Sequence, residues 1–287
     1  MLRDLPLFDH LMHRLGRAAA LRLAQARLAL PTALQRPSHT NPNVVVSLTT
    51  FPARIGHVSA TLESIYRQNT APAHVVLVLS KEEFVNQELP QEIEAFRDRG
   101  LRVLFEPGNA RSYKKLIPAL NLFPDKVIVT ADDDVIYPRL WLEELVRAHE
   151  ERPHHVLGHR GTLIVSRGGR VEPYLTWPRA LRDSPSSKVF LTGMGGILYP
   201  PGSLPDQVSD MNLAMTLCPT ADDIWFKAMA LLAGTPTAKI SDASGDFPSL
   251  PSGRISALNQ LNVGELRNDT QFTAVMKHFD LWDKLSL

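Results

Sequence analysis

Residues 127–134 read Val-Ile-Val-Thr-Ala-Asp-Asp-Asp and join an apolar strand to three carboxylates. A continuous apolar, β-branched run is typical of a strand covered on both faces of a parallel sheet. Three adjacent carboxylates at its end repel one another unless a cation lies nearby. In an extended segment Asp132 and Asp134 point the same way, which suits a divalent cation. The alternative interpretation is a solvated turn before the helix that begins near Trp141.

Similar apolar strands alternate with helical segments through the first half of the chain. Strands are predicted over 44–48, 75–79, 101–105 and 127–130, and helices over 57–68, 82–99 (with a break at Pro90) and 113–122. This alternation predicts βαβ units and a mostly parallel sheet, in which ligands bind beyond the carboxyl ends of the strands. Polar residues follow those ends, among them Thr49 and Thr50 after the first strand.

The second half is predicted to mix short strands with helices. Helices are expected over 141–151, 221–232 and 263–280, and strands over 163–165, 171–175, 189–192 and 196–199. The overall expectation is an α/β fold with a mostly parallel central sheet flanked by helices. A single domain over 43–282 would then divide into a nucleotide-binding half (43–138) and a mixed acceptor-side half (139–282).

The charge distribution singles out the first 36 residues. The chain holds 31 basic and 30 acidic residues, a balance that argues against a nucleic-acid-binding protein. Residues 1–36 nevertheless carry six arginines and two aspartates, and residues 5–30 read as an Ala- and Leu-rich helix before a Pro-rich linker over 31–43. This basic helix either lies on an anionic membrane surface through residues 1–30 or packs on the body or a second subunit.

The remaining composition indicates the compartment. A single cysteine excludes an intrachain disulfide, and no apolar run is long enough to cross a bilayer. No secretory signal is visible. The sequence therefore predicts a cytoplasmic protein, and contact of the basic helix with lipid would make it peripheral on the inner face of the membrane.

Three further groups could carry chemistry. Asp222 and Asp223 open a predicted helix, where carboxylates are favoured by capping, yet such a pair could also supply a general base. Lys114 and Lys115 could meet phosphates or remain solvated. A glycine-rich loop from Gly193 permits either close approach to a ligand or an ordinary tight turn.

Taken together, these segments resemble bacterial glycosyltransferase family 2-like proteins of the GT-A fold. The resemblance runs from residue 44 to residue 282 and is carried by VVVSLTTFPARI, YKKLIPAL, VIVTADDDVIYP, GMGGILYPPGSL, PTADDIWFKAMAL and NDTQFTAVMKHFDLW. It implies transfer of a sugar from a nucleotide-diphosphate sugar, and it suggests UDP as the nucleotide. The acceptor would be a saccharide or a lipid-linked saccharide in lipopolysaccharide or capsule synthesis.

The resemblance also implies roles for particular residues. Asp134 and Asp132 would bind a Mn²⁺ or Mg²⁺ ion. Asp223, with Asp222 as the alternative, would be the base of an inverting transfer. The residues assigned to the nucleotide sugar are Thr49, Thr50, Arg54, Lys114, Lys115, Asp132 and Asp133. The residues assigned to the acceptor pocket are Gly193, Gly195, Gly196 and Trp225.

Two other functions compete with this interpretation. A sugar nucleotidylyltransferase would carry a Gly-rich, Arg/Lys-bearing loop after its first strand, where this chain has TTFPARIG. A catalytically silent nucleotide-sugar-binding scaffold would not need both acidic clusters. The sequence leaves the donor sugar, the acceptor, the linkage and the oligomeric state open.

Overall fold

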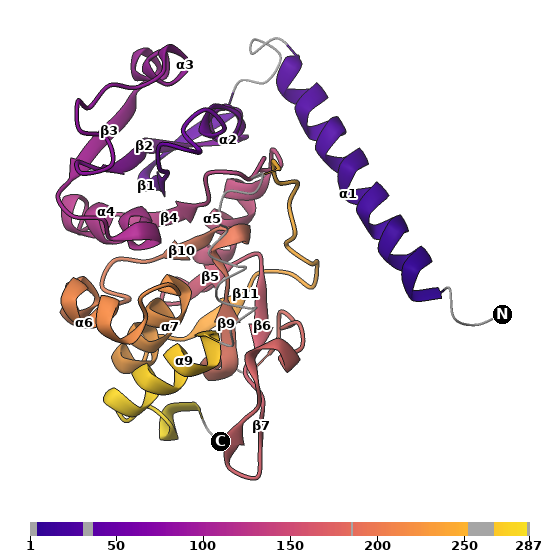
Figure 1. Ribbon diagram of the computed structural model, residues 1–287, viewed down its shortest axis with the longest axis vertical. Coiled ribbons are helices and arrows are strands. Elements are labelled where there is room, and N and C mark those ends of the chain that lie inside the picture. The colour runs from indigo at the N-terminus through magenta and orange to yellow at the C-terminus, as the bar shows by residue number, and fades with distance from the viewer. Residues whose placement is uncertain (1–4, 31–36, 185, 252–266, 286–287) are drawn as a thin grey trace.

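A seven-stranded, mostly parallel sheet forms the centre of the computed structural model, which describes residues 5–30, 37–184, 186–251 and 267–285. Its strands are β1 (His39–Thr49), β2 (Thr70–Ser80), β3 (Leu101–Glu106), β4 (Val127–Ala131), β5 (Val156–Gly158), β10 (Ile197–Tyr199) and β11 (Thr237–Lys239). They lie in the order β11-β5-β10-β4-β1-β2-β3 (Figure 1). Only β10 is antiparallel to its neighbours. The predicted α/β fold with a mostly parallel sheet is confirmed.

Helices cover both faces of this sheet. They are α2 (Val58–Tyr66), α3 (Gln91–Glu94), α4 (Ile117–Leu122), α5 (Trp141–Glu151), α6 (Met211–Leu217), α7 (Asp222–Ala233) and α9 (Arg267–His278). Along β1, Val44 and Val46 pack into the core beneath α2 and α5, whereas Val45 packs into the core shared with α4, α7 and α9. This alternation of side chains explains why the strands are apolar throughout.

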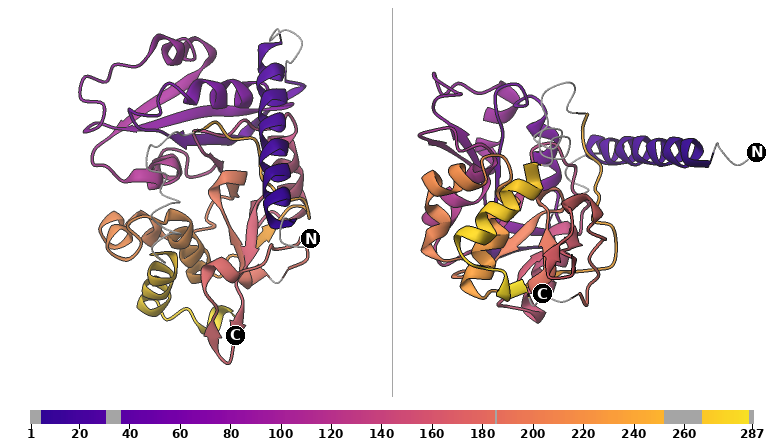
Figure 2. Two further views of the ribbon diagram at one scale, coloured as in Figure 1. Left: turned by 45° about the vertical axis from the view of Figure 1, so that its right-hand side comes forward. Right: turned by 60° about the horizontal axis from the view of Figure 1, so that its bottom comes forward.

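The first helix, α1 (Leu5–Ala29), stands apart from the rest of the molecule, and its N-terminal end points away from the body (Figure 2). Its C-terminal end is attached, because Arg27 Nη2 donates to the Tyr137 carbonyl (2.7 Å) and Arg67 Nη1 donates to the Leu30 carbonyl (2.7 Å). The helix predicted over 5–30 is confirmed. Residues 31–36 of the expected linker lie outside the described residues, and residues 39–43 belong to β1 instead.

The helix predicted over 82–99 is wrong for most of its length. Only α3 and a 3-10 helix, η2 (Arg97–Arg99), form there. The acidic side chains at its start bind the next crossover: Glu82 Oε1 accepts the Gly108 N–H (2.8 Å), and Glu83 Oε2 accepts from Lys114 Nζ (2.9 Å). These bonds hold residues 82–83 in a turn that supports the crossover after β3.

The second half contains two small sheets besides the central one. They pair β6 (Gly161–Leu163) with β9 (Val189–Leu191), and β7 (Ser166–Arg167) with β8 (Arg170–Val171). Gly168 and Gly169 turn the second pair with φ values of 58° and 74°, the left-handed conformation that a tight hairpin requires. The sequence did not predict β5, β11 or α6, because segments this short show no reliable periodicity.

Candidate active site

The central sheet reverses its strand order between β1 and β4. From β1 the chain adds β2 and β3 on one side and then returns to place β4 on the other. In open α/β sheets, ligands bind at the carboxyl ends of the strands beside such a switch point. Thr50 follows β1 there, and the aspartate segment (Asp132, Asp133 and Asp134) follows β4. The topology alone therefore brings these polar groups to one crevice.

Asp133 anchors the aspartate segment. Its buried carboxylate accepts hydrogen bonds from Thr50 Oγ1 (2.6 Å) and Arg54 Nη1 (2.8 Å), and its carbonyl accepts one from Thr61 Oγ1 (3.0 Å). Burial raises the pKa of Asp133, although Thr50 and Arg54 oppose the shift. The same Arg54 nitrogen lies 3.3 Å from Asp134 Oδ2. Thr50 and Arg54 thus fix the segment that carries the candidate metal ligands.

Lys115 connects the aspartate segment to the second acidic pair. Its Nζ lies 3.2 Å from Asp132 Oδ1 and 3.0 Å from Asp222 Oδ2. Ser112 Oγ donates to the other oxygen of Asp222 (2.8 Å). Burial lowers the pKa of Lys115, but Asp132, Asp222 and Asp223 raise it well above its ordinary value. One charged amine therefore joins groups that are 90 residues apart in the chain.

Among the described residues, Asp222 and Asp223 each have one buried oxygen without a hydrogen bond, but that of Asp222 is ion-paired with Lys115. Asp223 Oδ2 accepts the Gly193 N–H (3.0 Å), whereas Asp223 Oδ1 is buried without a hydrogen-bond partner in the described part of the chain. Burial, followed by the charge of Asp222, raises the pKa of Asp223 to about 7. A partly unbonded carboxylate with a pKa near neutrality has the properties of a general base.

Gly193 lies at the junction of these groups. A Cβ added there would be 2.5 Å from Lys115 Nζ, 3.2 Å from Asp132 Oδ1 and 3.4 Å from Asp223 Oδ1. Gly193→Ala should therefore displace the lysine and lower turnover about tenfold or more, since misplacing a catalytic group by about 1 Å has effects of this size. Kinetic assay beside Gly16→Ala, where an added Cβ meets nothing within 4 Å, tests this. Equal activity of the two variants would contradict the close packing of charged groups around Gly193.

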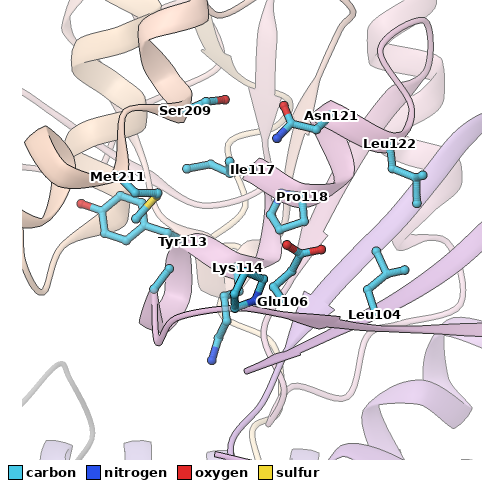
Figure 3. Close-up of a pocket in the computed structure, with 12 residues that line it drawn as sticks. Leu104, Glu106, Tyr113, Lys114, Ile117, Pro118, Asn121, Leu122, Ser209 and Met211 are labelled. Atoms are coloured by element: carbon cyan, nitrogen blue, oxygen red, sulfur yellow. The ribbon is translucent and has the colours of Figure 1, made fainter. Parts of the chain in front are cut away.

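Lys114 does not join this cluster: its Nζ is paired with Glu83 Oε2 (2.9 Å), and the residue is one of those that line a separate cavity (Figure 3). The cavity has a volume of about 470 Å³ and lies between β3, α4 and α6, with Glu106 and Met211 among its lining residues. The 3-10 helix η3 (Arg111–Lys115) lies between the cavity and the charged cluster. Ser112 and Lys115 contact the acidic pair on one side, whereas Lys114 lines the cavity on the other. The two lysines therefore have different surroundings.

Thr49 and Trp225 are engaged elsewhere in the fold. Thr49 Oγ1 donates to the Val78 carbonyl (2.7 Å) and ties β1 to β2. Trp225 is fully buried, and its Nε1 donates to the Val208 carbonyl (3.0 Å). In this structure the Trp225 ring is closed to solvent and has no free face on which a sugar could stack.

Gly195 and Gly196 pack against Trp141. The Gly195 carbonyl accepts from Trp141 Nε1 (2.8 Å), and a Cβ on Gly196, whose φ is 81°, would lie 2.6 Å from the indole ring. Of the three glycines assigned to the acceptor pocket, Gly193 is the one whose surroundings include the charged cluster.

The carboxylates of the aspartate segment fit one kind of metal site. Within residues 5–30, 37–184, 186–251 and 267–285, no group of three His, Cys, Asp or Glu residues is arranged to hold a metal. Mg²⁺ and Mn²⁺, however, are often held by one or two carboxylates together with substrate phosphates and water. Burial and the neighbouring charge of Asp132 raise the pKa of Asp134 to about 6, so a cation there would relieve unfavourable negative charge. The donor set fits an ion shared with a diphosphate.

Sequence reasoning missed two residues that organise this site. Ser112 donates to Asp222, and the Tyr137 hydroxyl accepts the Asp132 N–H (2.9 Å). A lone serine carries no motif. Tyr137 does lie in the VIVTADDDVIYP block, five residues after Asp132, and an expected tight turn there would have brought the two together.

Comparison with known proteins finds a family model that matches part of the chain. Residues 56–195 match the family model described as Glycosyl transferase family 2. The matched segment contains Lys115 and the aspartate segment, and it ends before the acidic pair. No curated protein matches the sequence.

Three solved structures illustrate the similarity in fold. The 4-diphosphocytidyl-2C-methyl-D-erythritol synthase from Anaerococcus prevotii is similar over 75% of this chain and 94% of its own, with 10% identity and a TM-score of 0.48. S. aureus TarS in complex with UDP is similar over 70% of this chain, which spans 59% of the TarS chain, with 16% identity and a TM-score of 0.46. The mannosyltransferase PcManGT from Pyrobaculum calidifontis, in complex with GDP-Man and Mn²⁺, is similar over 84% of this chain and 67% of its own, with 19% identity and a TM-score of 0.41.

The segment matched by the family model includes part of the central sheet that borders the candidate site. The matched residues contain β2, β3 and β4 and the crevice residues that follow β4. The expected resemblance to family 2-like glycosyltransferases of the GT-A fold is therefore confirmed, with the family match covering residues 56–195.

Proposed function

We propose that the protein is a metal-dependent, inverting glycosyltransferase that moves a sugar from a nucleotide-diphosphate sugar to a hydroxyl of a saccharide or lipid-linked acceptor. One observation supports this most directly: Lys115 contacts both Asp132 at the end of β4 (3.2 Å) and Asp222 at the start of α7 (3.0 Å). The candidate donor and acceptor groups therefore meet at the switch point of the sheet, where such folds bind ligands.

The aspartate segment forms the donor side of the proposed site. Asp134, with Asp132, would hold a Mn²⁺ or Mg²⁺ ion together with the diphosphate of the donor. When bound, such an ion offsets the negative charge that builds on the leaving diphosphate. Lys115, whose Nζ lies 3.2 Å from Asp132 Oδ1, would approach the same phosphates. Thr50 and Arg54 keep the segment in place through Asp133.

Asp223 forms the acceptor side. Its unbonded Oδ1 would take the proton from the acceptor hydroxyl as that oxygen attacks the anomeric carbon. The bond between the anomeric carbon and the diphosphate oxygen breaks on the opposite face, and the nucleoside diphosphate leaves with the electron pair. Attack opposite to the leaving group inverts the configuration at the anomeric carbon.

The products formed from candidate substrates test this function. The purified protein is incubated with Mn²⁺ and either nucleotide-diphosphate sugars together with a panel of saccharide and lipid-linked acceptors, or nucleoside triphosphates with sugar phosphates. A glycosyltransferase releases a nucleoside diphosphate from the first set and no pyrophosphate from the second. Pyrophosphate release would instead establish a nucleotidylyltransferase, and the absence of both reactions would leave the silent scaffold as the better account.

We further propose that the protein works in the cytoplasm, on acceptors held at the inner face of the membrane, in lipopolysaccharide or capsule synthesis. Three features of α1 support contact with an anionic lipid surface: its projection from the body, its arginines and its exposed Leu23 (73%). Among the described residues no helix is both long and apolar enough to span a bilayer.

Replacing Arg14, Arg17 and Arg22 together by Gln should weaken binding to phosphatidylserine-containing liposomes about tenfold or more. Each basic residue near an anionic surface contributes about 1 kcal/mol to binding. Arg27 is left intact because it attaches α1 to the body. Liposome co-sedimentation at fixed ionic strength measures the change.

A second triple variant, with Gln at Arg97, Arg102 and Arg170, removes the same net charge from exposed positions of the body. It should bind the liposomes as well as the parent protein does. Equal loss in both triple variants would show a non-specific charge effect and contradict a role for α1.

A further inference from the structure

Tyr137 closes the turn that carries the aspartate segment. Its side chain is fully buried, and its hydroxyl oxygen accepts the main-chain N–H of Asp132 at 2.9 Å. The bond joins the first residue of the segment to a residue just beyond its last. The direction in which Asp132 and Asp134 leave the main chain therefore depends on this contact.

The Tyr137 ring is itself held by other aromatic groups. It stacks on Trp141 with ring centroids 4.1 Å apart and meets the edge of Phe247 at 5.9 Å. Trp141 in turn donates through Nε1 to the Gly195 carbonyl (2.8 Å). The position of the hydroxyl is thus set by packing that reaches the loop beginning at Gly193, whose N–H binds Asp223.

The main chain of Tyr137 is also fixed on both sides. Its N–H donates to Ser64 Oγ (3.1 Å), and its carbonyl accepts from Arg27 of α1 (2.7 Å). With backbone and ring both held, the hydroxyl is a well-fixed acceptor for the Asp132 amide. Rigid support of this kind keeps a binding group within the tolerance that its ligand requires.

We propose that Tyr137 is a positioning residue of the donor site, whose hydroxyl holds the Asp132 main chain so that both Asp132 and Asp134 face the metal and diphosphate. This inference rests on the proposed function, since it assigns the donor to the aspartate segment. Tyr137 does not contact the donor in this account. It acts through the Asp132 amide, and its removal changes the geometry of the carboxylates rather than their number.

Tyr137→Phe isolates this bond, because phenylalanine keeps the ring and its stacking and removes only the acceptor. The matched control is Tyr113→Phe, since the buried Tyr113 hydroxyl also bonds the main chain, donating to the Cys218 carbonyl (2.6 Å). Losing one such bond should lower thermal stability similarly in both variants. A difference between them in ligand binding is then not explained by stability.

The binding measurement is calorimetric titration with whichever of UDP, GDP and dTDP the parent protein binds best, first with Mn²⁺ and then with EDTA. Tyr137→Phe should weaken the Mn²⁺-dependent affinity about tenfold, the effect of losing one buried hydrogen bond, and leave the affinity in EDTA unchanged. Hydrogen exchange at the Asp132 amide should become faster in the same variant. Tyr113→Phe should match the parent protein in both measurements.

Two results would overturn the inference while the proposed function stands. One is equal Mn²⁺-dependent affinity in Tyr137→Phe and the parent protein. The other is an equal loss of affinity with Mn²⁺ and with EDTA, which indicates general damage to the site. If the parent protein binds none of the nucleotides, the proposed function fails and this inference fails with it.

Discussion

Asp223→Asn is expected to abolish turnover, with a fall of about 10³-fold, while nucleotide binding stays unchanged. A general base contributes about 10²–10⁴-fold to rate, and asparagine cannot take a proton from the acceptor. The amide can still accept the Gly193 N–H, so the loop keeps its contact. Steady-state turnover and calorimetric nucleotide affinity, measured on the same preparation, separate the two effects.

The stability of this variant provides a second readout. The pKa of Asp223 is raised from 3.8 to about 7, so ionisation of the folded protein is disfavoured relative to the unfolded chain. The resulting loss of stability is full above about pH 7 and absent below about pH 4. Asp223→Asn should therefore be at least as resistant to heat as the parent protein at pH 8. A protein that is inactive yet undiminished in stability cannot owe its inactivity to unfolding.

Asp222→Asn is the matched comparison at the neighbouring position. Asp222 accepts from Ser112 and pairs with Lys115, which is 5% exposed. Removing that charge leaves a buried amine with less compensation, so this variant should unfold at a lower temperature than the parent. Normal turnover in Asp223→Asn, together with a catalytic loss in Asp222→Asn, would move the base to Asp222 and contradict the assignment made here.

Asp134→Asn is expected to weaken Mn²⁺-dependent nucleotide binding about 100-fold. A neutral amide is a poor ligand for a hard cation that has few other protein ligands in this site. Arg54 remains bonded to Asp133, so the segment should keep its shape. Calorimetry with Mn²⁺, compared with the same titration in EDTA, measures the metal-dependent part of the affinity.

The control for this prediction is Asp98→Asn, at an exposed position of η2 distant in sequence from the aspartate segment. It removes the same charge and should bind nucleotide as the parent protein does. Unchanged Mn²⁺-dependent affinity in Asp134→Asn would remove Asp134 from the metal site and favour Asp132 as the sole carboxylate ligand.

The location of this site can be predicted from the sequence, whereas most contacts between its residues cannot. Continuous apolar runs mark β1 and β4 and therefore their carboxyl ends, so Thr50 and the aspartate segment could be placed at one edge of the sheet. It is harder to predict which partner each of two neighbouring residues on a short 3-10 helix contacts. Lys114 and Lys115 are identical in type, yet one binds Glu83 and the other joins the two acidic clusters.

Helix α7 is buried on nearly all sides, and for this reason the surroundings of Trp225 could not be predicted from the sequence. Nine of the twelve residues of α7 are buried, so its hydrophobic pattern does not mark one face. The acidic pair at its start could be recognised, but not which carboxylate pairs with Lys115. That choice is made by tertiary contacts with η3 and the Gly193 loop, both distant in sequence.

The most direct test of a metal-dependent donor site at the switch point is calorimetric titration of the purified protein with UDP, GDP, CMP and dTDP, with Mn²⁺ and then with EDTA. We expect one nucleotide to bind tightly with Mn²⁺ and to lose most of its affinity when the metal is chelated. A folded protein that binds none of the four, or that binds one equally well in EDTA, would contradict the account.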